Sequence, residues 1–187
     1  GMRKQISVWI DREIKNAKAG KTAEIVVKAN SLSDVKLISK LYDAAEAGVK
    51  VSLIVRGIFC AVLQGKKIKE NTTAISIIDE YLEHARVMYF YNGGKEKMYI
   101  SSADWMVRNL DHRVEAAIPI IDKKILQELK DIIHIQLRDN VKARILDKEL
   151  SNNYVPFGGR KRVRSQVETY QYLLQKTLKD INETSSN

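Results

Sequence analysis

The segment from Tyr81 to Arg113 carries the residues of this chain that are best suited to chemistry on phosphate groups. It contains His84 and Arg86, a tight turn at 92–94, and the polar cluster 101–104 (Ser-Ser-Ala-Asp). In an extended segment, residues i and i+2 point to the same side, so His84 and Arg86 would face one site. The turn folds the chain back, and we expect the next strand to deliver the polar cluster to the same end. A titratable group among cations and hydroxyls suits phosphate chemistry.

The charge balance points to a polyanionic partner or substrate. The 187 residues include 32 Lys and Arg against 23 Asp and Glu, which gives a formal net charge of +9 at pH 7. Such an excess attracts polyanions through the summed field of the protein. The length and the hydrophobic content of 44% predict one domain, spanning 1–187, with a full core.

Several protein classes are disfavoured by what the sequence lacks. A single cysteine, Cys60, cannot form an internal disulfide, and with no secretory segment we expect a cytoplasmic protein. No apolar run is long enough to span a bilayer. His84, His112 and His134 are scattered without a CxxC motif, so no metal site is predicted. Gly1 before Met2 resembles the remnant of an expression tag, and a start directly in a predicted helix suggests a fragment of a longer protein.

The first part of the chain predicts a parallel pair of strands joined by a helix. A packing helix over 3–19 comes first, followed by the β-rich run AEIVVKAN at 23–30 and the apolar run VKVSLIV at 49–55. Between the two runs, Ser31 and Asp34 form a predicted capping box for an amphipathic helix that ends at Gly48. The short connections indicate a right-handed βαβ unit whose strands are buried on both faces.

Arg56 follows the second of these strands. Functional residues in such sheets collect at the carboxyl ends of strands, where the first strand ends with Lys28 and Asn30. An arginine before Gly57 is therefore a candidate phosphate clamp. A surface arginine paired with a carboxylate is an equally good interpretation of the same spacing.

The remainder predicts an α/β fold with a mixed sheet flanked by helices. A helix capped by Asp122 comes next, and His134 within it is expected to be structural. Ser165 and Glu168 form a predicted capping box for a last helix. We expect its tail to fray from Asn182. The basic run at 160–162 is either a solvated charge cluster or the mouth of a polyanion channel. The other predicted segments are an exposed basic loop at 58–73, strands at 74–78, 97–102 and 113–120, an extended piece at 140–146 and a loop at 147–164.

Longer stretches carry a resemblance to a known family. His84-Ala85-Arg86 followed by Ser101-Ser102-Ala103-Asp104 resembles the signature of the phospholipase D superfamily. With NSLSD from Asn30, AGVKVSLIVRGI from Ala47 and YISSADWMVRNLDHRVE from Tyr99, the chain resembles the C-terminal catalytic domain of bacterial polyphosphate kinases from about residue 3 to about residue 172. Phe59 and Leu63-Gln64-Gly65 depart from the family pattern, which affects the expected loop shape.

The resemblance implies a phospholipase D-like domain that forms half of an active site. In that family, a histidine of a second domain, absent here, is phosphorylated by ATP, and the γ-phosphate passes reversibly to polyphosphate with Mg²⁺. The histidine matching His84 is the implied catalytic residue. ATP, ADP, polyphosphate and the N-terminal part of the same enzyme are the implied partners, with a homo-oligomer at full length and no specific nucleic acid. The arginine matching Arg56 is implied to bind the nucleotide phosphates. Together with the polar residues of the 81–113 segment, the candidate ATP- and phosphate-binding residues are Arg56, His84, Arg86, Ser102, Asp104, Arg108, Asn109 and Arg113.

Alone, the chain is therefore expected to lack kinase activity. Two alternatives remain open at this point. One is a phospholipase D-type phosphodiesterase or nuclease in which two copies of the chain bring their histidines together. The other is a non-catalytic module that binds polyanions through its basic loops.

Overall fold

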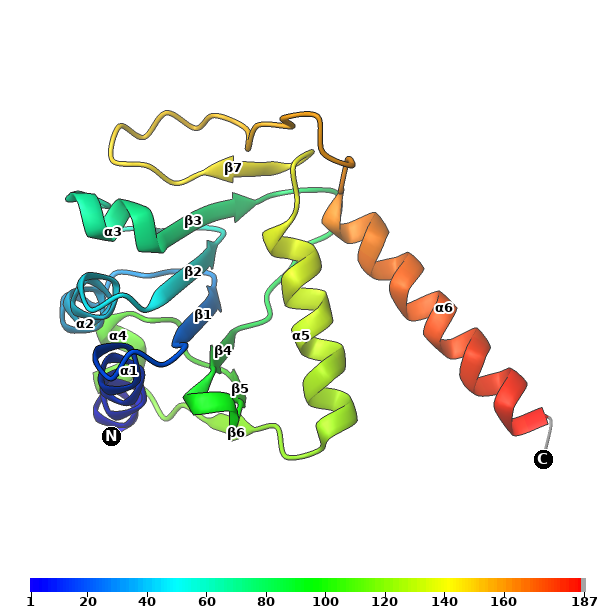
Figure 1. Cartoon of the computed structure of the whole chain (residues 1–187), viewed down its shortest axis with the longest axis horizontal. Coiled ribbons are helices and arrows are strands. Elements are labelled where there is room, and N and C mark those ends of the chain that lie inside the picture. The colour runs from blue at the N-terminus through cyan, green and yellow to red at the C-terminus, as the bar shows by residue number, and fades with distance from the viewer. Residues whose placement is uncertain (186–187) are drawn as a thin grey trace.

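The computed structural model describes residues 1–185, which fold into one mixed sheet covered by helices on both faces (Figure 1). The predicted α/β class with a mixed, helix-flanked sheet is confirmed, and the phospholipase D-like label rests on the sequence resemblance. The helices are α1 (Met2–Lys18), α2 (Val35–Glu46), α3 (Lys66–Asn71), the 3-10 turn η1 (Asn92–Gly94), α4 (Val107–His112), α5 (Lys123–Leu137) and α6 (Ser165–Ser185). The strands are β1 (Glu24–Ala29), β2 (Lys50–Val55), β3 (Thr72–Ile77), β4 (Val87–Phe90), β5 (Lys97–Ser101), β6 (Ala117–Pro119) and β7 (Ala143–Ile145).

The sheet has seven strands in the order β6-β5-β4-β1-β2-β3-β7. β1, β2 and β3 are parallel neighbours, as predicted for the strand–helix–strand unit, whereas β4 pairs antiparallel with β1 and with β5. The 81–113 segment thus joins the same sheet through its hairpin. Pro119 lies in β6, the edge strand, where a residue without an N–H is tolerated.

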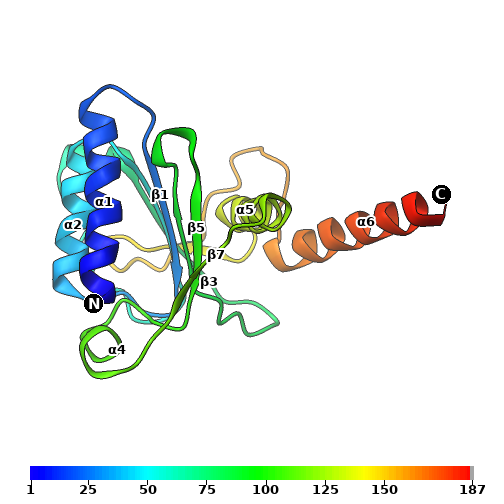
Figure 2. The same cartoon turned by 90° about the horizontal axis from the view of Figure 1, so that it is seen from below.

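Both faces of the central strand are buried because successive side chains alternate between them. Ile25 and Val27 of β1 belong to the core beneath α1 and α2, and Val26 belongs to a second core beneath α5. Figure 2 shows α1 and α2 on one side of the sheet and α5 on the other. α6 extends from the α5 side away from the body, and no helix within residues 1–185 is long and apolar enough to cross a membrane.

The two predicted capping boxes do not form. The α2 cap is Asp34 alone, whose carboxylate accepts the N–H of Leu37 at 3.0 Å, while Ser31 lies outside the first turn. At α6, Asp139 accepts the N–H of Ser165 at 2.7 Å, so a residue distant in sequence caps the helix. In a capping box the serine is the N-cap residue. Here Ser31 lies three residues before the N-cap Asp34, and Ser165 is already the first residue of α6.

Two predicted irregular segments contain helix. Within 58–73, residues Lys66–Asn71 form α3, which starts after Gly65 with φ +96°. β3 already starts at Thr72. The predicted frayed tail from Asn182 is wrong up to Ser185, since α6 continues to that residue. The rest of that predicted tail, 186–187, lies outside the described residues.

Candidate phosphate-binding site

The candidate site lies at the edge of the sheet where β1, β2 and β5 end and β4 begins. This convergence follows from the topology, because antiparallel β4 starts opposite the end of β1, and Val87 pairs with Lys28. Leu32 forms isolated bridges with Phe59 and with Trp105, which tie the segments after β1, β2 and β5 together. Residues from four separate parts of the sequence therefore meet at one edge.

Arg56, directly after β2, bonds only to neutral groups. Its Nε and Nη2 donate to Oδ1 of Asn30 at 3.0 and 2.6 Å, and its Nη1 donates to the backbone carbonyl of Glu83 at 3.0 Å. No carboxylate forms an ion pair with Arg56 in the part of the chain that the structure describes. The geometry therefore argues against the surface ion pair left open by the sequence. The half-buried guanidinium of Arg56 is instead available to bind an anion.

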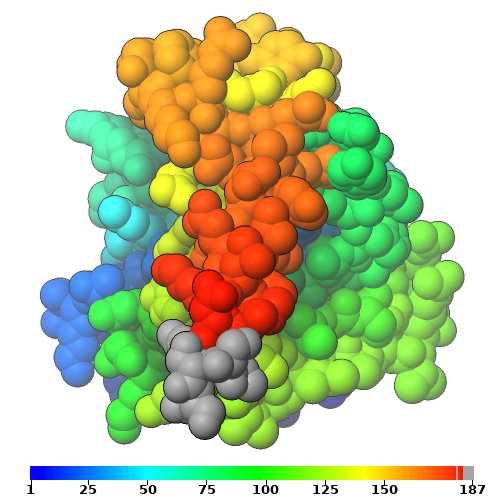
Figure 3. Space-filling view, turned by 90° about the vertical axis from the view of Figure 1, so that its right-hand side faces the viewer, coloured from blue at the N-terminus to red at the C-terminus, as the bar shows by residue number. Residues whose placement is uncertain are grey.

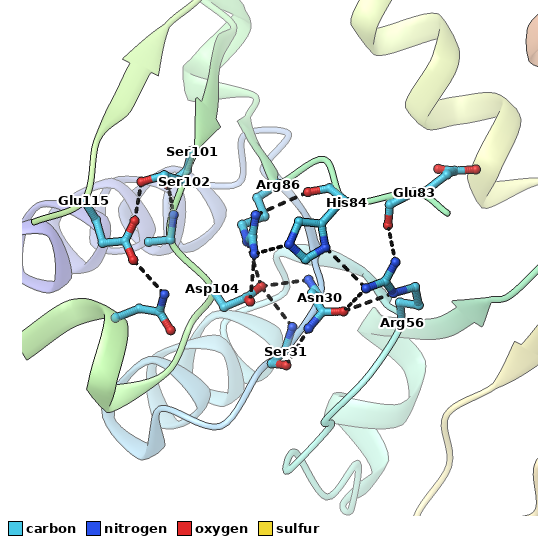
Figure 4. Close-up of polar contacts among 12 residues, drawn as sticks. Asn30, Ser31, Arg56, Glu83, His84, Arg86, Ser101, Ser102, Asp104 and Glu115 are labelled. Atoms are coloured by element: carbon cyan, nitrogen blue, oxygen red, sulfur yellow. Dashed lines mark hydrogen bonds and ion pairs between the residues drawn. The ribbon is translucent and has the colours of Figure 1, made fainter. Parts of the chain in front are cut away.

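His84 lies between two arginines (Figure 4). Nη2 of Arg56 is 3.3 Å from its Nδ1, and Nη2 of Arg86 is 2.8 Å from its Nε2. The predicted convergence of residues two apart is thus present, although His84 and Arg86 precede β4 in irregular backbone. The imidazole is exposed on its open side, as a group that meets a ligand must be.

These contacts cannot all be satisfied by the protein alone. Guanidinium groups only donate hydrogen bonds, and a neutral imidazole has one acceptor nitrogen and one N–H. Only one arginine can therefore donate to the ring of His84, and the other contact brings two donors together. An oxygen-rich anion at this position would accept from the ring and from both arginines, which is the arrangement that phosphate groups favour.

The carboxylate of Asp104 fixes the orientation of Arg86. Its Oδ1 accepts the backbone N–H groups of Asn30 and Ser31 at 2.8 and 3.0 Å and lies 3.0 Å from Nε of Arg86, and its Oδ2 accepts from Nη2 at 3.2 Å. Burial alone would raise the pKa of Asp104, but the hydrogen bonds from Arg86 and from the two backbone groups hold that pKa below its usual range. The carboxylate therefore joins the ends of β1 and β5 and positions a cation.

Ser102 and Asn109 form a second polar group beside the arginines. Glu115 accepts hydrogen bonds from Oγ of Ser102 and, at 2.7 Å, from Nδ2 of Asn109. Oδ1 of Asn109 is buried without a hydrogen-bond partner among the described residues. The hydroxyl of Ser102 also accepts the N–H of Ala116 at 3.0 Å, so it is held by the two residues that precede β6 and not by His84.

Arg108 and Arg113 are not brought into this arrangement. Both are exposed, Arg108 in the first turn of α4 and Arg113 directly after that helix. Within residues 1–185, no hydrogen bond or ion pair joins either of them to His84, Arg56 or Arg86. They lie in and directly after α4, outside the cluster around His84.

Four residues of the site were absent from the predicted set: Asn30, Ser31, Glu83 and Glu115. Asn30 was placed by the sequence at the carboxyl end of a parallel strand, where ligand-binding residues collect, but it was not included among the candidate phosphate-binding residues. Glu83 and Glu115 act through contacts with residues distant in the sequence, and spacing gives no signal for those.

The chain is similar to known proteins. A protein-family model described as polyphosphate kinase C-terminal domain 2 matches residues 1–166. The chain is 52% identical over 172 residues to a polyphosphate kinase of Vibrio parahaemolyticus and 48% identical over 171 residues to that of Escherichia coli. In both comparisons the match covers 91% of this chain and 25% of the relative.

A solved structure extends the similarity to three dimensions. The crystal structure of polyphosphate kinase from Porphyromonas gingivalis superposes with a TM-score of 0.89 at 46% identity, covering 94% of this chain and 27% of that one. The chain spans about a quarter of the length of the curated relatives it matches. The chain belongs to the polyphosphate kinase family, in which it matches C-terminal domain 2.

Proposed function

We propose that this chain forms one half of a polyphosphate kinase active site, which transfers the γ-phosphate of ATP reversibly to inorganic polyphosphate. The observation that carries the proposal is the unneutralised Arg56 beside His84, with Arg86 on the far side of the ring. Membership of the family supports the reaction type. A phosphohistidine carried by another part of the full-length enzyme would supply the group that is transferred.

The roles of Arg56, His84, Arg86 and Asp104 follow from their bonding. Phosphoryl transfer depends mainly on positioning and on neutralising charge on the phosphate oxygens. Arg56 and Arg86 would donate to those oxygens from opposite sides of His84. The imidazole itself would donate a hydrogen bond, or a proton, to the oxygen on which charge develops. Asp104 would keep Arg86 in place, and Ser102, Arg108, Asn109 and Arg113 are proposed to contact phosphates further along the rim.

The residues present do not fit a resident magnesium ion. Both oxygens of Asp104 are engaged by Arg86 and backbone N–H groups, and no group of three or more His, Cys, Asp or Glu side chains within residues 1–185 is arranged to hold a metal. Mg²⁺ prefers several oxygen ligands, including substrate phosphates. Any magnesium would therefore enter with ATP as part of the substrate.

The remaining features of the proposal concern the context of the chain. ATP, ADP and polyphosphate are the proposed ligands, and the rest of the enzyme, which the curated relatives contain, is the proposed partner. We also propose a cytoplasmic homo-oligomer for the full-length protein. Specific nucleic-acid binding is not part of the proposal.

The test is a binding experiment combined with an activity assay on the isolated chain. Inorganic tripolyphosphate should bind with an affinity that falls steeply between low and high salt, because exposed charges are screened beyond about 10 Å at 0.1 M. Arg56→Ala should weaken binding more than Lys179→Ala, an exposed control on α6. Incubation with ATP, Mg²⁺ and polyphosphate should give no phosphoryl transfer.

Three outcomes would contradict the proposal. Robust ATP-dependent synthesis by this chain would show that the nucleophile lies within it. Hydrolysis of a labelled phosphodiester, lost in His84→Ala, would favour the dimeric phosphodiesterase or nuclease. Binding that ignores salt and Arg56 would favour a polyanion module that uses another surface.

A further inference from the structure

The carboxylate of Glu83, the residue before His84, is anchored on the opposite side of the chain from the candidate site. Figure 4 shows its side chain directed away from the imidazole, toward α5. Three side chains from three elements bind it: Lys28 of β1, Gln136 of α5 and Gln166 of α6. Among the described residues, the ring of His84 contacts the two arginines and none of these three side chains.

Two of these anchors are buried. Lys28 is 7% exposed and Gln136 is 4% exposed. Lys28 forms an ion pair with Oε2 of Glu83 and donates to Oε1 of Gln136 at 2.9 Å, while Gln136 donates to the same Oε2 at 2.6 Å. Burial lowers the pKa of Lys28, and the charge of Glu83 only partly opposes that effect. The three groups therefore form a closed network under the segment that leads to His84.

The third anchor comes from the first turn of α6. Gln166 accepts the N–H of Tyr81 at 2.9 Å and donates to the Tyr81 carbonyl at 2.7 Å, and the same amide donates to Oε1 of Glu83 at 3.2 Å. One side chain thus holds two residues of the segment. In Figure 3, α6 points toward the viewer from this side of the molecule, and its first turns (orange) lie beside the blue-green segment that contains Tyr81.

The anchored residue is connected to the site through its backbone. The carbonyl of Glu83 accepts from Nη1 of Arg56 at 3.0 Å, and His84 follows in the chain. A buried ion pair contributes little to stability compared with apolar residues of similar size, and its best-attested use is to select one arrangement. Here the arrangement selected is the one in which Arg56 and His84 face the same ligand.

We propose that Glu83 is a positioning residue for His84 and Arg56, and that Lys28, Gln136 and Gln166 hold it from beneath. This inference rests on the proposed function, because it assigns these residues to the phosphate site described above. The first turn of α6, which carries Gln166, thus helps to order the site.

Gln166→Ala in the full 187-residue chain is the most informative variant. The residue is half-buried and Tyr81 is exposed, so water can replace the lost partners and the chain should fold. The control is Gln175→Ala, an exposed residue of the same type on the same helix. The measurements are the thermal unfolding midpoint, the ring resonances of His84 in a histidine-labelled sample with His112 as internal reference, and the affinity for inorganic tripolyphosphate.

Gln166→Ala should shift or broaden the His84 resonances, leave those of His112 in place, and weaken tripolyphosphate binding about threefold to tenfold, as expected when two or three hydrogen bonds that order a segment are lost. Gln175→Ala should change neither the His84 resonances nor the tripolyphosphate affinity. Glu83→Gln, which keeps the side-chain length and an acceptor oxygen, should lose less affinity than Glu83→Ala.

Unchanged His84 resonances and affinity in folded Gln166→Ala would overturn the inference. Equal losses in Glu83→Gln and Glu83→Ala, in step with their unfolding midpoints, would reduce Glu83 to a residue that only stabilises the fold. Absence of tripolyphosphate binding by the unmodified chain would contradict the proposed function instead, and the His84 resonances would still decide whether Gln166 orders the segment.

Discussion

Replacing Asp104 by asparagine separates the two tasks of this carboxylate. The amide oxygen of the substituted side chain can still accept the N–H groups of Asn30 and Ser31, which both bond to Oδ1 of the aspartate. The amide NH₂ takes the place of Oδ2, which accepts from Nη2 of Arg86 at 3.2 Å. The variant therefore keeps the link between β1 and β5 and removes the ion pair with Arg86.

The expected loss of stability follows from these contacts. A hydrogen bond to a charged group contributes about 1.5–3 kcal/mol, so Asp104→Asn should lower the free energy of unfolding by about 2–3 kcal/mol near neutral pH. Asp104→Ala also leaves the two N–H groups without their acceptor, and each such group costs about 1–3 kcal/mol when buried. The alanine variant should therefore be less stable than the asparagine variant by at least about 2 kcal/mol.

The pH dependence gives an independent measure of the same interaction. Because the pKa of Asp104 is held below its usual value in the folded state, the unfolded chain binds a proton first as the pH falls. The stabilisation is complete above the ordinary aspartate pKa of about 3.9 and is lost as the pH falls through the lower folded-state pKa. The difference between the original chain and Asp104→Asn should therefore be constant near neutral pH and shrink below about pH 4.

Urea denaturation from about pH 3 to about pH 8 is the assay, and Asp43→Asn on the exposed face of α2 is the matched control. The control should leave the free energy of unfolding within about 0.5 kcal/mol of the original value. The reasoning would be refuted by an asparagine variant as stable as the original chain, or by a difference that persists unchanged on acidification. In either case Asp104 would not be held by Arg86.

Three further predictions concern other contacts. Arg164→Ala breaks a two-bond contact with the carboxylate of Asp79, at 2.8 and 2.7 Å, and should lower the midpoint of chemical denaturation at neutral pH; the loss should shrink in acid, because Arg164 lowers the pKa of Asp79. In Gly57→Ala the new Cβ would lie 3.0 Å from the carbonyl oxygen of Asn30, so the unfolding midpoint should fall by the equivalent of about 1 kcal/mol and tripolyphosphate affinity should fall with it. In the full-length enzyme, His84→Ala should lower kcat by about 10² to 10⁴ with less effect on ATP binding, and His84→Gln should retain substantial activity only if the ring acts as a hydrogen-bond donor and not in proton transfer.

The central sheet could be predicted from the sequence because its strands differ in pattern from the helices around them. The run 49–55 is too short and too β-branched for a helix, and the structure has β2 there. The caps were harder, since Asp139 reaches α6 from a distance of 26 residues in the sequence. Short helix α3 lacks the apolar periodicity on which helix prediction depends.

The candidate site divides in the same way. His84 and Arg86 meet as expected for residues two apart, although the strand on which that expectation depended starts only at Val87. Arg56 follows from the rule that ligand residues lie at carboxyl ends of parallel strands. Arg108 and Arg113 were included because they follow the polar cluster 101–104 in the sequence, but Arg108 lies within α4 and Arg113 directly after it, outside the cluster around His84. The role of Glu83 depends on Lys28, Gln136 and Gln166, which only the folded chain brings together.

The mixed order of the strands has a consequence for how the chain folds. Central β1 takes β2 as one neighbour and β4 as the other, and Ile25 pairs with Phe90, which is synthesised 65 residues later. Pairings between segments so distant in the chain form slowly, because the intervening loop must close first. The parallel unit of β1, β2 and β3 can assemble while the chain is still growing, but it contains Asn30 and Arg56 without His84 or Asp104. We therefore expect anion binding to be among the last properties that the chain acquires during refolding, after most of its helical signal has returned.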